Sequence, residues 1–402
     1  MRPFTATVPF DDALGGVIAA ARPVEGAERL DVTLADGRVL ALDIVADQDV
    51  PAFDRAAMDG YAVVAADTIN ATADAPVSLT RTGRVVTGET AAHPVVSGSC
   101  IEVATGAPLP DGADAVVMVE HTRQDGDAIV FSRPATVRQH VGSRGGDIRA
   151  GESLLNRGDV LTPARIGAIT AIGLTHVTTY VRPRVAIMCT GDEVISPGRP
   201  LAAGQVYNVN RYTLEALVRR HGGEPVIMPT TGDSLDALNA SLAMARECQL
   251  IVSSGGSSVG EHDLVIDVLR EHGEVIFHGV NIKPGKPTVF GRIGRTLWLG
   301  LSGYPASCLS NAYVLLVPLL RQTARLPEWT PRIVTVPLAR RITSARGRLQ
   351  FYQVRVEHGQ AAPAFKASGD ITSMAHADGY IVIPADVESL EAETPVMVTM
   401  YE

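Results

Sequence analysis

The chain has 402 residues, with 35 Lys and Arg against 44 Asp and Glu, which gives a formal net charge of −9. This charge disfavours a nucleic-acid-binding protein, because neutralising phosphates requires a basic surface. The 5% aromatic content also disfavours a surface on which nucleic-acid bases stack. The length suggests about two to four domains. The 46% hydrophobic content is enough to form hydrophobic cores, which disfavours intrinsic disorder.

The four cysteines are far apart in the sequence and include no C-x-x-C pair: Cys100, Cys189, Cys248 and Cys308. Neither a zinc site nor a disulfide framework is indicated. The first residues lack the basic start and apolar run of a secretory signal, so a cytoplasmic protein is expected. Residues 296–320 are uncharged, but Gly, Pro, Ser and Asn interrupt them. They are interpreted as a strand, a loop and a buried helix and not as a membrane span.

The first 180 residues contain short β-prone runs, such as 116–119 and 129–131, separated by turn clusters. Few helical patterns occur there. The clear exception is a helix over 164–172, which Thr162-Pro163 precedes and Gly173 ends. We expect a β-rich domain at 46–146, inserted into an N-terminal and linker domain made of residues 1–45 and 147–180.

From residue 184 onward, β-branched apolar runs alternate with amphipathic stretches. Strands are expected at 185–189, 225–228, 250–252, 275–277 and 297–299, and helices at 210–221, 235–244, 261–272 and 305–320. This alternation predicts a doubly wound α/β domain over 181–326, with a mostly parallel sheet and a ligand site at the carboxyl ends of its strands. The runs at 333–336, 351–356 and 380–383 predict a small C-terminal β-barrel over 327–402.

The loop after the third predicted strand contains Gly256-Ser257-Ser258-Val259-Gly260, which satisfies the G-x-S-x-G pattern of a hydrolase. Ser258 would then be a nucleophile, with Asp267 or Asp370 and His376 as possible partners. The preferred alternative is a glycine-rich turn that presents backbone N–H groups to an anion at a helix N-terminus.

Lys283-Pro284-Gly285-Lys286-Pro287 is not a P-loop, because Pro287 occupies the position of the required Ser or Thr. It places two ammonium groups on a stiff segment, which suits a compact multivalent oxyanion. The alternative is a solvent-facing turn between two strands.

Several acidic residues stand beside glycine or in turns: Asp59, Asp147, Glu193, Asp233 and Asp263. Carboxylates in such turns can bind Mg²⁺ or accept hydrogen bonds from the N–H edge of a heterocycle. The alternative for each of these residues, taken alone, is a structural role in a turn or a helix cap. The ten histidines show no metal-binding spacing.

Taken in order, these motifs resemble those of the molybdopterin molybdenumtransferases, the family of bacterial MoeA and the gephyrin E-domain. The matching blocks are Ala57-Met58-Asp59-Gly60-Tyr61-Ala62, Thr105-Gly106-Ala107-Pro108, Gly146-Asp147-Ile148-Arg149, Thr190-Gly191-Asp192-Glu193, the serine–glycine loop at 253–260 and the lysine segment at 283–287.

The resemblance implies that molybdenum from molybdate is inserted into adenylated molybdopterin with release of AMP, in the presence of a divalent cation such as Mg²⁺. It also implies four domains and an elongated homodimer, in which the α/β domain of one subunit faces the β-rich domain of the other. A molybdopterin adenylyltransferase and molybdoenzymes would be its partners. The second functional prediction is a non-catalytic pterin-binding or scaffolding member of the family.

The resemblance also assigns roles to residues. Catalytic positions would be Asp59, Thr105, Asp147, Glu193, Asp233 and Asp263, with Glu193 and Asp233 binding Mg²⁺ and Asp59 and Asp147 orienting the pterin or nucleotide. Substrate-binding positions would be Ser254, Gly255, Gly256, Ser258, Lys283, Lys286, Ser307 and Arg348. Lys283, Lys286 and Ser307 would hold molybdate, and Arg348 would be a fourth member that Arg355 could replace.

The chain departs from the family pattern at three positions: Ser257 replaces Val, Ser302 replaces Pro and Tyr304 replaces Asn. Tyr304 is the bulkiest change, and it is expected either to narrow the oxyanion pocket or to stack on a ligand.

Overall fold

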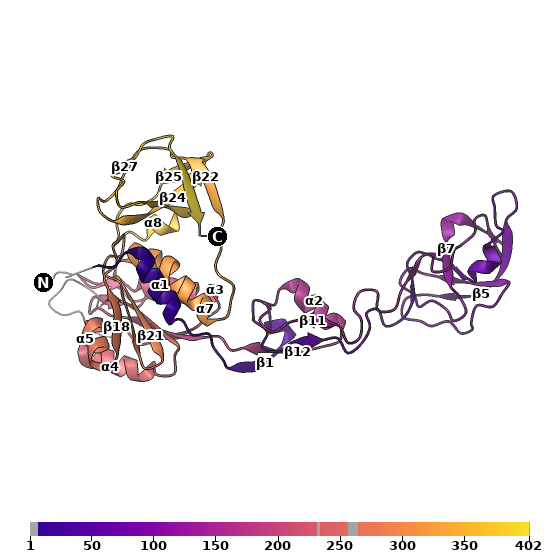
Figure 1. Ribbon diagram of the computed structural model, residues 1–402, viewed down its shortest axis with the longest axis horizontal. Coiled ribbons are helices and arrows are strands. Elements are labelled where there is room, and N and C mark those ends of the chain that lie inside the picture. The colour runs from indigo at the N-terminus through magenta and orange to yellow at the C-terminus, as the bar shows by residue number, and fades with distance from the viewer. Residues whose placement is uncertain (1–6, 231–233, 256–263, 402) are drawn as a thin grey trace. The chain divides into compact units, whose positions relative to one another are not determined.

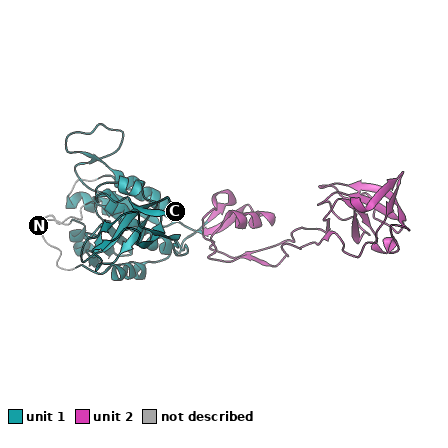
Figure 2. Cartoon of the chain, turned by 90° about the horizontal axis from the view of Figure 1, so that it is seen from above, with its two compact units in different colours: residues 1–28, 180–402 teal, residues 29–179 magenta. Residues whose placement is uncertain are grey.

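The computed structural model describes residues 7–230, 234–255 and 264–401. The contacts divide the chain into two compact units, residues 1–28 with 180–402 and residues 29–179 (Figure 2). The four-domain division remains a prediction. No helix among the described residues combines the length and the apolar character that a membrane crossing requires.

The second unit contains a six-stranded sheet in which every neighbouring pair is antiparallel except β5 and β6. In spatial order its strands are β7 (Ala115–Met118), β4 (Gly60–Val63), β6 (Ser99–Val103), β5 (Val77–Val85), β9 (Ala128–Phe131) and β8 (Thr122–Asp125). The side chains of β4 alternate between two cores, with Tyr61 and Val63 in one and Ala62 in the other. Both faces of this sheet are therefore covered.

A separate core in this unit surrounds Leu40, Leu161 and Ile169. The predicted helix is α2 (Pro163–Ala171), and the Thr162 hydroxyl accepts the Arg165 N–H at its start, at 3.4 Å. The remaining elements are short: β1 (Ala27–Asp31) paired with β12 (His176–Tyr180), β2 (Ile44–Val45) with β11 (Ser153–Leu155), β3 (Arg55–Ala56) with β10 (Val141–Gly142), and the 3-10 turns η1 (Val32–Leu34), η2 (Ala65–Thr68) and η3 (Val119–His121).

Close backbone packing in the six-stranded sheet gives a testable prediction at Gly60. A Cβ added there would lie 2.0 Å from the Val117 carbonyl oxygen. We expect Gly60→Ala to lower the free energy of unfolding by about 1–3 kcal/mol, the usual cost of overpacking. The matched control is Gly83→Ala on β5, where the nearest atom to a Cβ is 3.9 Å away. Chemical denaturation of both variants tests this, and equal midpoints would contradict it.

The first unit contains the predicted α/β sheet (Figure 1). In spatial order it consists of β16 (Glu224–Ile227), β13 (Arg184–Cys189), β17 (Leu250–Ser254), β21 (Thr296–Leu301), β20 (Val289–Ile293) and β18 (Glu274–His278). The first four strands are parallel, as predicted. The last two form an antiparallel hairpin edge, and β20 was not anticipated from the sequence.

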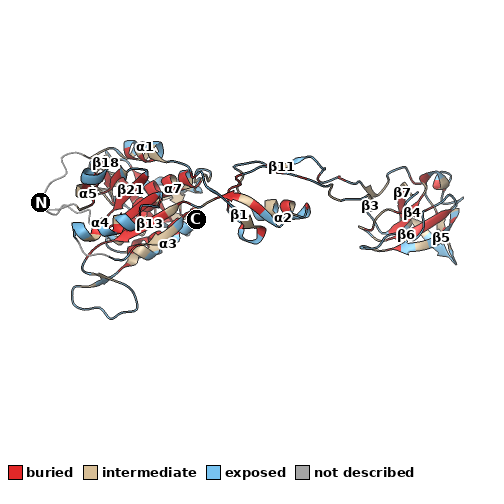
Figure 3. Ribbon diagram, turned by 90° about the horizontal axis from the view of Figure 1, so that it is seen from below, coloured by how far each residue is buried: buried red, intermediate tan, exposed pale blue. Residues whose placement is uncertain are grey.

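Successive residues of β13 point to opposite faces of this sheet. Val185 and Ile187 belong to the core that receives α1, α3 and α6, whereas Ala186 and Met188 belong to the core that receives α4 and α5. Figure 3 shows β13 coloured as mostly buried. The helices are α1 (Phe10–Ala20), α3 (Val209–Arg220), α4 (Leu235–Met244), α5 (Leu264–His272), α6 (Pro305–Asn311) and α7 (Val317–Thr323), with the π-helical turn η4 (Ala312–Leu316) between the last two. This arrangement confirms a doubly wound α/β fold.

Two helical features differ from the sequence-based expectation. The helix α1 was missed because Gly15 and Gly16 weaken its local preference, while burial of Ala13 and Val17 stabilises it. The single helix expected over 305–320 is interrupted by η4, and Pro318 follows directly. Proline has no N–H to continue the α-helical pattern, which explains the local rearrangement.

The C-terminal region is a small β-barrel, as predicted. Its strands follow the order β22 (Ile333–Pro337), β28 (Pro395–Met400), β26 (Gly379–Ile383) and β24 (Leu349–Glu357), and β24 also pairs with β25 (Gln360–Pro363) and β19 (Ile282–Lys283). A bridge between Leu338 and Ala361 closes the barrel. The short elements β14 (Val194–Ile195) with β15 (Val206–Tyr207), β23 (Ile342–Thr343) with β27 (Ser389–Leu390), and α8 (Thr372–Ala375) complete the unit.

Candidate functional site

Three loops follow the carboxyl ends of β13, β17 and β21, and we call their residues 190–193, 254–255 and 302–304 the rim. The Thr190 N–H donates to the Ser254 carbonyl at 3.1 Å, and the Gly255 N–H donates to the Leu301 carbonyl at 3.4 Å. Gly255 has a φ of +94°, and a Cβ there would lie 2.6 Å from the Thr190 carbonyl oxygen. The loops therefore meet, as the strand order predicts.

Asn210 connects two of these loops, although the sequence analysis did not single it out. It lies near the start of α3 and is 8% exposed. Its Nδ2 donates to Ser254 Oγ and to the Gly303 carbonyl, both at 2.7 Å. Ser254 Oγ in turn donates to the Ser302 carbonyl at 3.2 Å. Asn210 thereby fixes the position of one loop relative to the other.

Glu193, a predicted Mg²⁺ ligand, is exposed at the rim. A Cβ on Gly191, whose φ is +136°, would lie 2.8 Å from both Glu193 carboxylate oxygens. The absence of a side chain at residue 191 thus lets the Glu193 carboxylate fold back over the loop. The Glu193 carbonyl accepts the Val206 N–H at 2.9 Å, which anchors the far end of the same loop.

Two cysteines lie in the core below the rim. Burial raises the pKa of the Cys189 thiol to about 11 and that of the Cys308 thiol to about 12. Both groups are therefore neutral thiols near pH 7, and neither is activated as a thiolate nucleophile.

The lysine segment at 283–287 is not a simple solvent-facing turn. Lys283 belongs to β19, and both lysines are half-buried. The Gly285 carbonyl accepts hydrogen bonds from Asn311 Nδ2 at 3.0 Å and from Thr288 Oγ1 at 2.8 Å. Asn311 is fully buried at the end of α6. The segment is thus attached to the helix that begins at the rim.

Ser307 and Arg348 lie in the same region. Ser307 is in α6, is 2% exposed, and its N–H donates to the Ser368 carbonyl at 3.4 Å. Arg348 directly precedes β24, in which Leu349 is the register partner of Ile282 and Gln350 that of Lys283. We call Lys283, Lys286, Ser307 and Arg348, the residues predicted to hold an oxyanion, the oxyanion site.

Arg355, the alternative to Arg348, lies farther along β24. It pairs with Glu357 at 2.8 Å, and its register partner is Ala362 of β25. Of these two arginines, Arg348 is therefore the nearer to the lysine segment along the β19–β24 register.

The two described departures from the family pattern are accommodated locally. Ser302 is 5% exposed, and its Oγ accepts the Tyr304 N–H at 3.2 Å, so the loop keeps a bonded turn without proline. Tyr304 is 65% exposed, and a Cβ on Gly369 would lie 3.5 Å from its ring. The Tyr304 side chain lies at the surface of the rim and does not fill its interior.

In the second unit, two predicted site residues are in direct contact. Asp59 Oδ1 accepts the Thr105 N–H at 2.7 Å and the Thr105 hydroxyl at 3.0 Å. These bonds, the backbone one first, hold the pKa of the Asp59 carboxyl below its ordinary value of 3.8. Asp59 is therefore an oriented anion at neutral pH.

This contact predicts a specific pH dependence. Because folding lowers the Asp59 pKa, its contribution to stability is fully present above about pH 4 and is lost as the pH falls through the lowered value. Thr105→Val removes one of the two donors and should raise the pKa of Asp59 toward its ordinary value, whereas Thr105→Ser should leave it unchanged. Carboxyl NMR titrations measure this directly, and identical values in all three proteins would refute it.

Asp147 is exposed, and its N–H donates to the Val50 carbonyl at 3.0 Å. Charged pairs surround this segment: Arg144 binds Asp49 at 2.6 Å, and Arg138 binds Asp54. The backbone at Asp147 is thus anchored, and its carboxylate is available to solvent.

The predicted site residues Asp233, Gly256, Ser258 and Asp263, and the departure at Ser257, lie outside the described residues. Of the serine-hydrolase partners proposed for Ser258, Asp267 is in α5, whereas Asp370 and His376 flank the short helix α8, so the triad remains an untested prediction. Within the described ranges, no group of three or more His, Cys, Asp or Glu residues is arranged to hold a metal ion.

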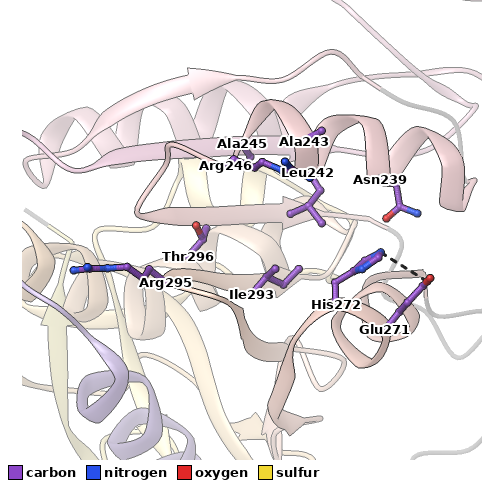
Figure 4. A pocket seen from close by; sticks show the side chains of 10 residues that line it. All are labelled: Asn239, Leu242, Ala243, Ala245, Arg246, Glu271, His272, Ile293, Arg295 and Thr296. Atoms are coloured by element: carbon purple, nitrogen blue, oxygen red, sulfur yellow. Dashed lines mark ion pairs between the residues drawn. The ribbon is translucent and has the colours of Figure 1, made fainter.

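A cavity of about 720 Å³ lies between α4, α5 and the turn that joins β20 to β21 (Figure 4). Its lining residues are Asn239, Leu242, Ala243, Ala245, Arg246, Glu271, His272, Ile293, Arg295 and Thr296. Thr296 begins β21, so the cavity is at the amino end of that strand, opposite the rim. It includes none of the predicted site residues.

Comparison with known proteins gives matches along most of the chain. Residues 8–173 match the MoeA N-terminal region (domain I and II), residues 186–322 a probable molybdopterin binding domain, and residues 335–401 the MoeA C-terminal region (domain IV).

Molybdopterin molybdenumtransferase 2 of Mycobacterium tuberculosis (strain ATCC 25618 / H37Rv) is 36% identical over 395 residues, which are 95% of this chain and 96% of that protein. Molybdopterin molybdenumtransferase of Haemophilus influenzae is 31% identical over 93% of this chain and 94% of its own. A crystal structure of a molybdopterin biosynthesis MoeA protein from Pyrococcus horikoshii has a TM-score of 0.86 and 36% identity, and covers 99% of this chain and 100% of its own. The chain belongs to the molybdopterin molybdenumtransferase family.

Proposed function

We propose that this protein is an enzyme of molybdenum cofactor biosynthesis, which inserts molybdenum from molybdate into adenylated molybdopterin and releases AMP. Family membership supports this role. The observation that carries it is the position of α6. This helix begins at the rim and its last residue, Asn311, holds the lysine segment, so a helix of seven residues, about 10 Å long, separates the two.

The oxyanion site supplies charge suited to molybdate. Lys283 and Lys286 bring two ammonium groups to one stiff segment, and Arg348 lies beside it across the β19–β24 pair. Ammonium groups act as compact point charges, while a guanidinium presents a fork of donors. Together they would hold a tetrahedral dianion and keep it next to the substrate bound at the rim.

The rim would bind the adenylated pterin. Backbone groups there are fixed by Asn210, and Glu193 holds an exposed carboxylate folded back over Gly191. Hard oxygen donors of this kind fit Mg²⁺, which typically takes one or two carboxylates and completes its shell with waters and phosphates. Glu193, together with Asp233, would hold the ion, which would neutralise charge on the pyrophosphate as it is cleaved.

The decisive experiment combines the purified protein with adenylated molybdopterin, Mg²⁺ and molybdate, and follows AMP and metallated cofactor together. We expect both products, with molybdate-dependent AMP release. Glu193→Gln and Asp233→Asn should each reduce Mg²⁺-dependent AMP release without unfolding the protein. Unchanged release in either variant would remove that residue from the metal role.

A non-catalytic pterin-binding relative is the second candidate, because Ser302 and Tyr304 depart from the family pattern. Such a protein would bind the pterin tightly without molybdate-dependent turnover. The similarity over most of the chain to proteins named molybdopterin molybdenumtransferase favours the enzyme, and the hydrogen bond from the Tyr304 N–H to Ser302 Oγ preserves a bonded turn despite the substitutions.

We also propose a homodimer, the four-domain division given above and a cytoplasmic location. A molybdopterin adenylyltransferase would deliver the substrate, and molybdoenzymes would receive the product. Light scattering coupled to size exclusion tests the dimer, and a monomer at micromolar concentration would contradict it.

A further inference from the structure

Lysine is very rare in this chain. Of the 35 Lys and Arg residues only three are lysines, Lys283, Lys286 and Lys366, which leaves 35 − 3 = 32 arginines. Arginine therefore carries nearly every positive charge in the protein. Because the two side chains differ in shape and in donor geometry, positions that keep lysine point to a requirement for a compact ammonium group.

All three lysines are in one region of the first unit, although Lys366 is 80 residues from Lys286 in the sequence. Lys283 Nζ is 5.9 Å from the centre of the Phe365 ring, within cation–π range. Phe365 directly precedes Lys366, and its N–H donates to the Gln353 carbonyl of β24 at 3.2 Å. β24 is also the strand that pairs with β19, which carries Lys283.

Lys366 is positioned by α8. Its N–H donates to Ser373 Oγ at 2.9 Å, and its Nζ donates to Thr372 Oγ1 at 3.2 Å. The side chain is nevertheless exposed, so the ammonium group is accessible to a ligand. A single hydroxyl partner satisfies only one of the three N–H donors of the ammonium group.

The loop that follows Lys366 is attached to the start of α6. The Ser368 carbonyl accepts the N–H of Ala306 at 3.0 Å and that of Ser307 at 3.4 Å. Gly369 lies against the ring of Tyr304. The barrel loop therefore lies beside both the rim and the buried Ser307 of the oxyanion site.

We propose that Lys366 is a third ammonium group of the oxyanion site, supplied by the C-terminal barrel, and that it binds a tetrahedral dianion together with Lys283 and Lys286. This inference rests on the proposed function and adds a residue to it. The ligand chemistry has two possible sources, free molybdate and the pyrophosphate group of the adenylated substrate, and the test distinguishes them.

The scarcity of lysine makes a direct test possible. Protein labelled only at lysine with ¹³C gives three side-chain signals, which single Lys→Arg variants assign. Sodium molybdate is titrated at constant ionic strength, and ADP is titrated separately as a soluble pyrophosphate compound. We expect all three signals to shift along one binding curve with molybdate. A shift of the Lys366 signal with ADP alone would assign that lysine to the pyrophosphate instead of to molybdate.

The inference is overturned if Lys283 and Lys286 respond to molybdate or ADP while Lys366 does not; the proposed function then stands. If no lysine responds and molybdate-dependent AMP release is also absent, both this inference and the proposed function fail. If no lysine responds but turnover persists, this inference alone fails.

Variants give a second readout. Lys366→Ala should weaken molybdate binding about tenfold, the effect of losing one charge-assisted hydrogen bond. Lys366→Arg should recover only part of this loss. The control is Arg341→Ala, which removes one positive charge from the same barrel at a residue paired with Glu391. Equal affinity in Lys366→Ala and Arg341→Ala would refute the assignment.

Discussion

Replacing Gly285 with alanine is expected to lower molybdate-dependent turnover by at least about 100-fold. A Cβ at this position would lie 1.9 Å from Asn311 Nδ2, a separation no folded protein tolerates, and the φ of +90° disfavours any L-residue. Either the lysine segment or Asn311 must move. A displacement of about 1 Å is enough to cost about 100-fold in rate when it misplaces a reacting group.

Gly294→Ala is the matched control for Gly285→Ala. Gly294 also has a positive φ, +59°, but no atom lies within 4 Å of an added Cβ. It should lose about 1–2 kcal/mol of stability from the backbone conformation alone and keep full activity. Thermal unfolding, molybdate binding and AMP release separate the two effects. If Gly285→Ala retained the molybdate affinity of Gly294→Ala, the lysine segment would not be the oxyanion site.

Replacing Asn210 with alanine is the second substitution with a large expected effect. It removes the donor that Ser254 Oγ and the Gly303 carbonyl share. Ser254 is buried, so the lost bond there should cost about 1–3 kcal/mol, whereas water can replace the donor at the exposed Gly303. The rim loops lose their common attachment. We expect kcat to fall about 100-fold, with a smaller change in KM, because Asn210 is only 8% exposed and acts by positioning the loops.

Asn210→Asp distinguishes hydrogen bonding from packing. The aspartate side chain has nearly the same shape, but an ionised carboxylate cannot donate to the Gly303 carbonyl. It should therefore be as inactive as the alanine variant. Asn239→Ala serves as the control, because Asn239 lines the cavity at the opposite edge of the sheet. A kcat in Asn210→Asp equal to that of the original protein would show that the amide does not hold the rim.

The parts of the fold that repeat a local pattern were predictable from the sequence. Residues 185–189 of one strand are a continuous apolar run followed by Thr190-Gly191, and the apolar run at 250–252 is followed by Ser253-Ser254-Gly255. Burial on both faces requires such runs, and the strand order then brings their final residues to one edge. The lysine segment was recognisable for a similar reason, since its residues are adjacent.

Contacts between distant polar residues were not predictable. Asn210 bonds to Gly303, 93 positions away, and Asn311 to Gly285, 26 positions away. An asparagine near a helix start or end has a routine local explanation, so nothing in the sequence distinguishes these two. Likewise, Lys366 becomes informative only when the contact between Lys283 and the neighbouring Phe365 is known. Tertiary packing, which sequence periodicity does not encode, decides these contacts.

The gathering of every lysine at one place has a practical consequence for handling the protein. Reagents that couple to primary amines, such as succinimidyl dyes, biotinylation reagents and amine-reactive sensor surfaces, have only these three side chains and the terminal amino group as targets. Random coupling would here modify the proposed oxyanion site itself. Conjugation through an introduced surface cysteine would avoid this, since all four native thiols are buried.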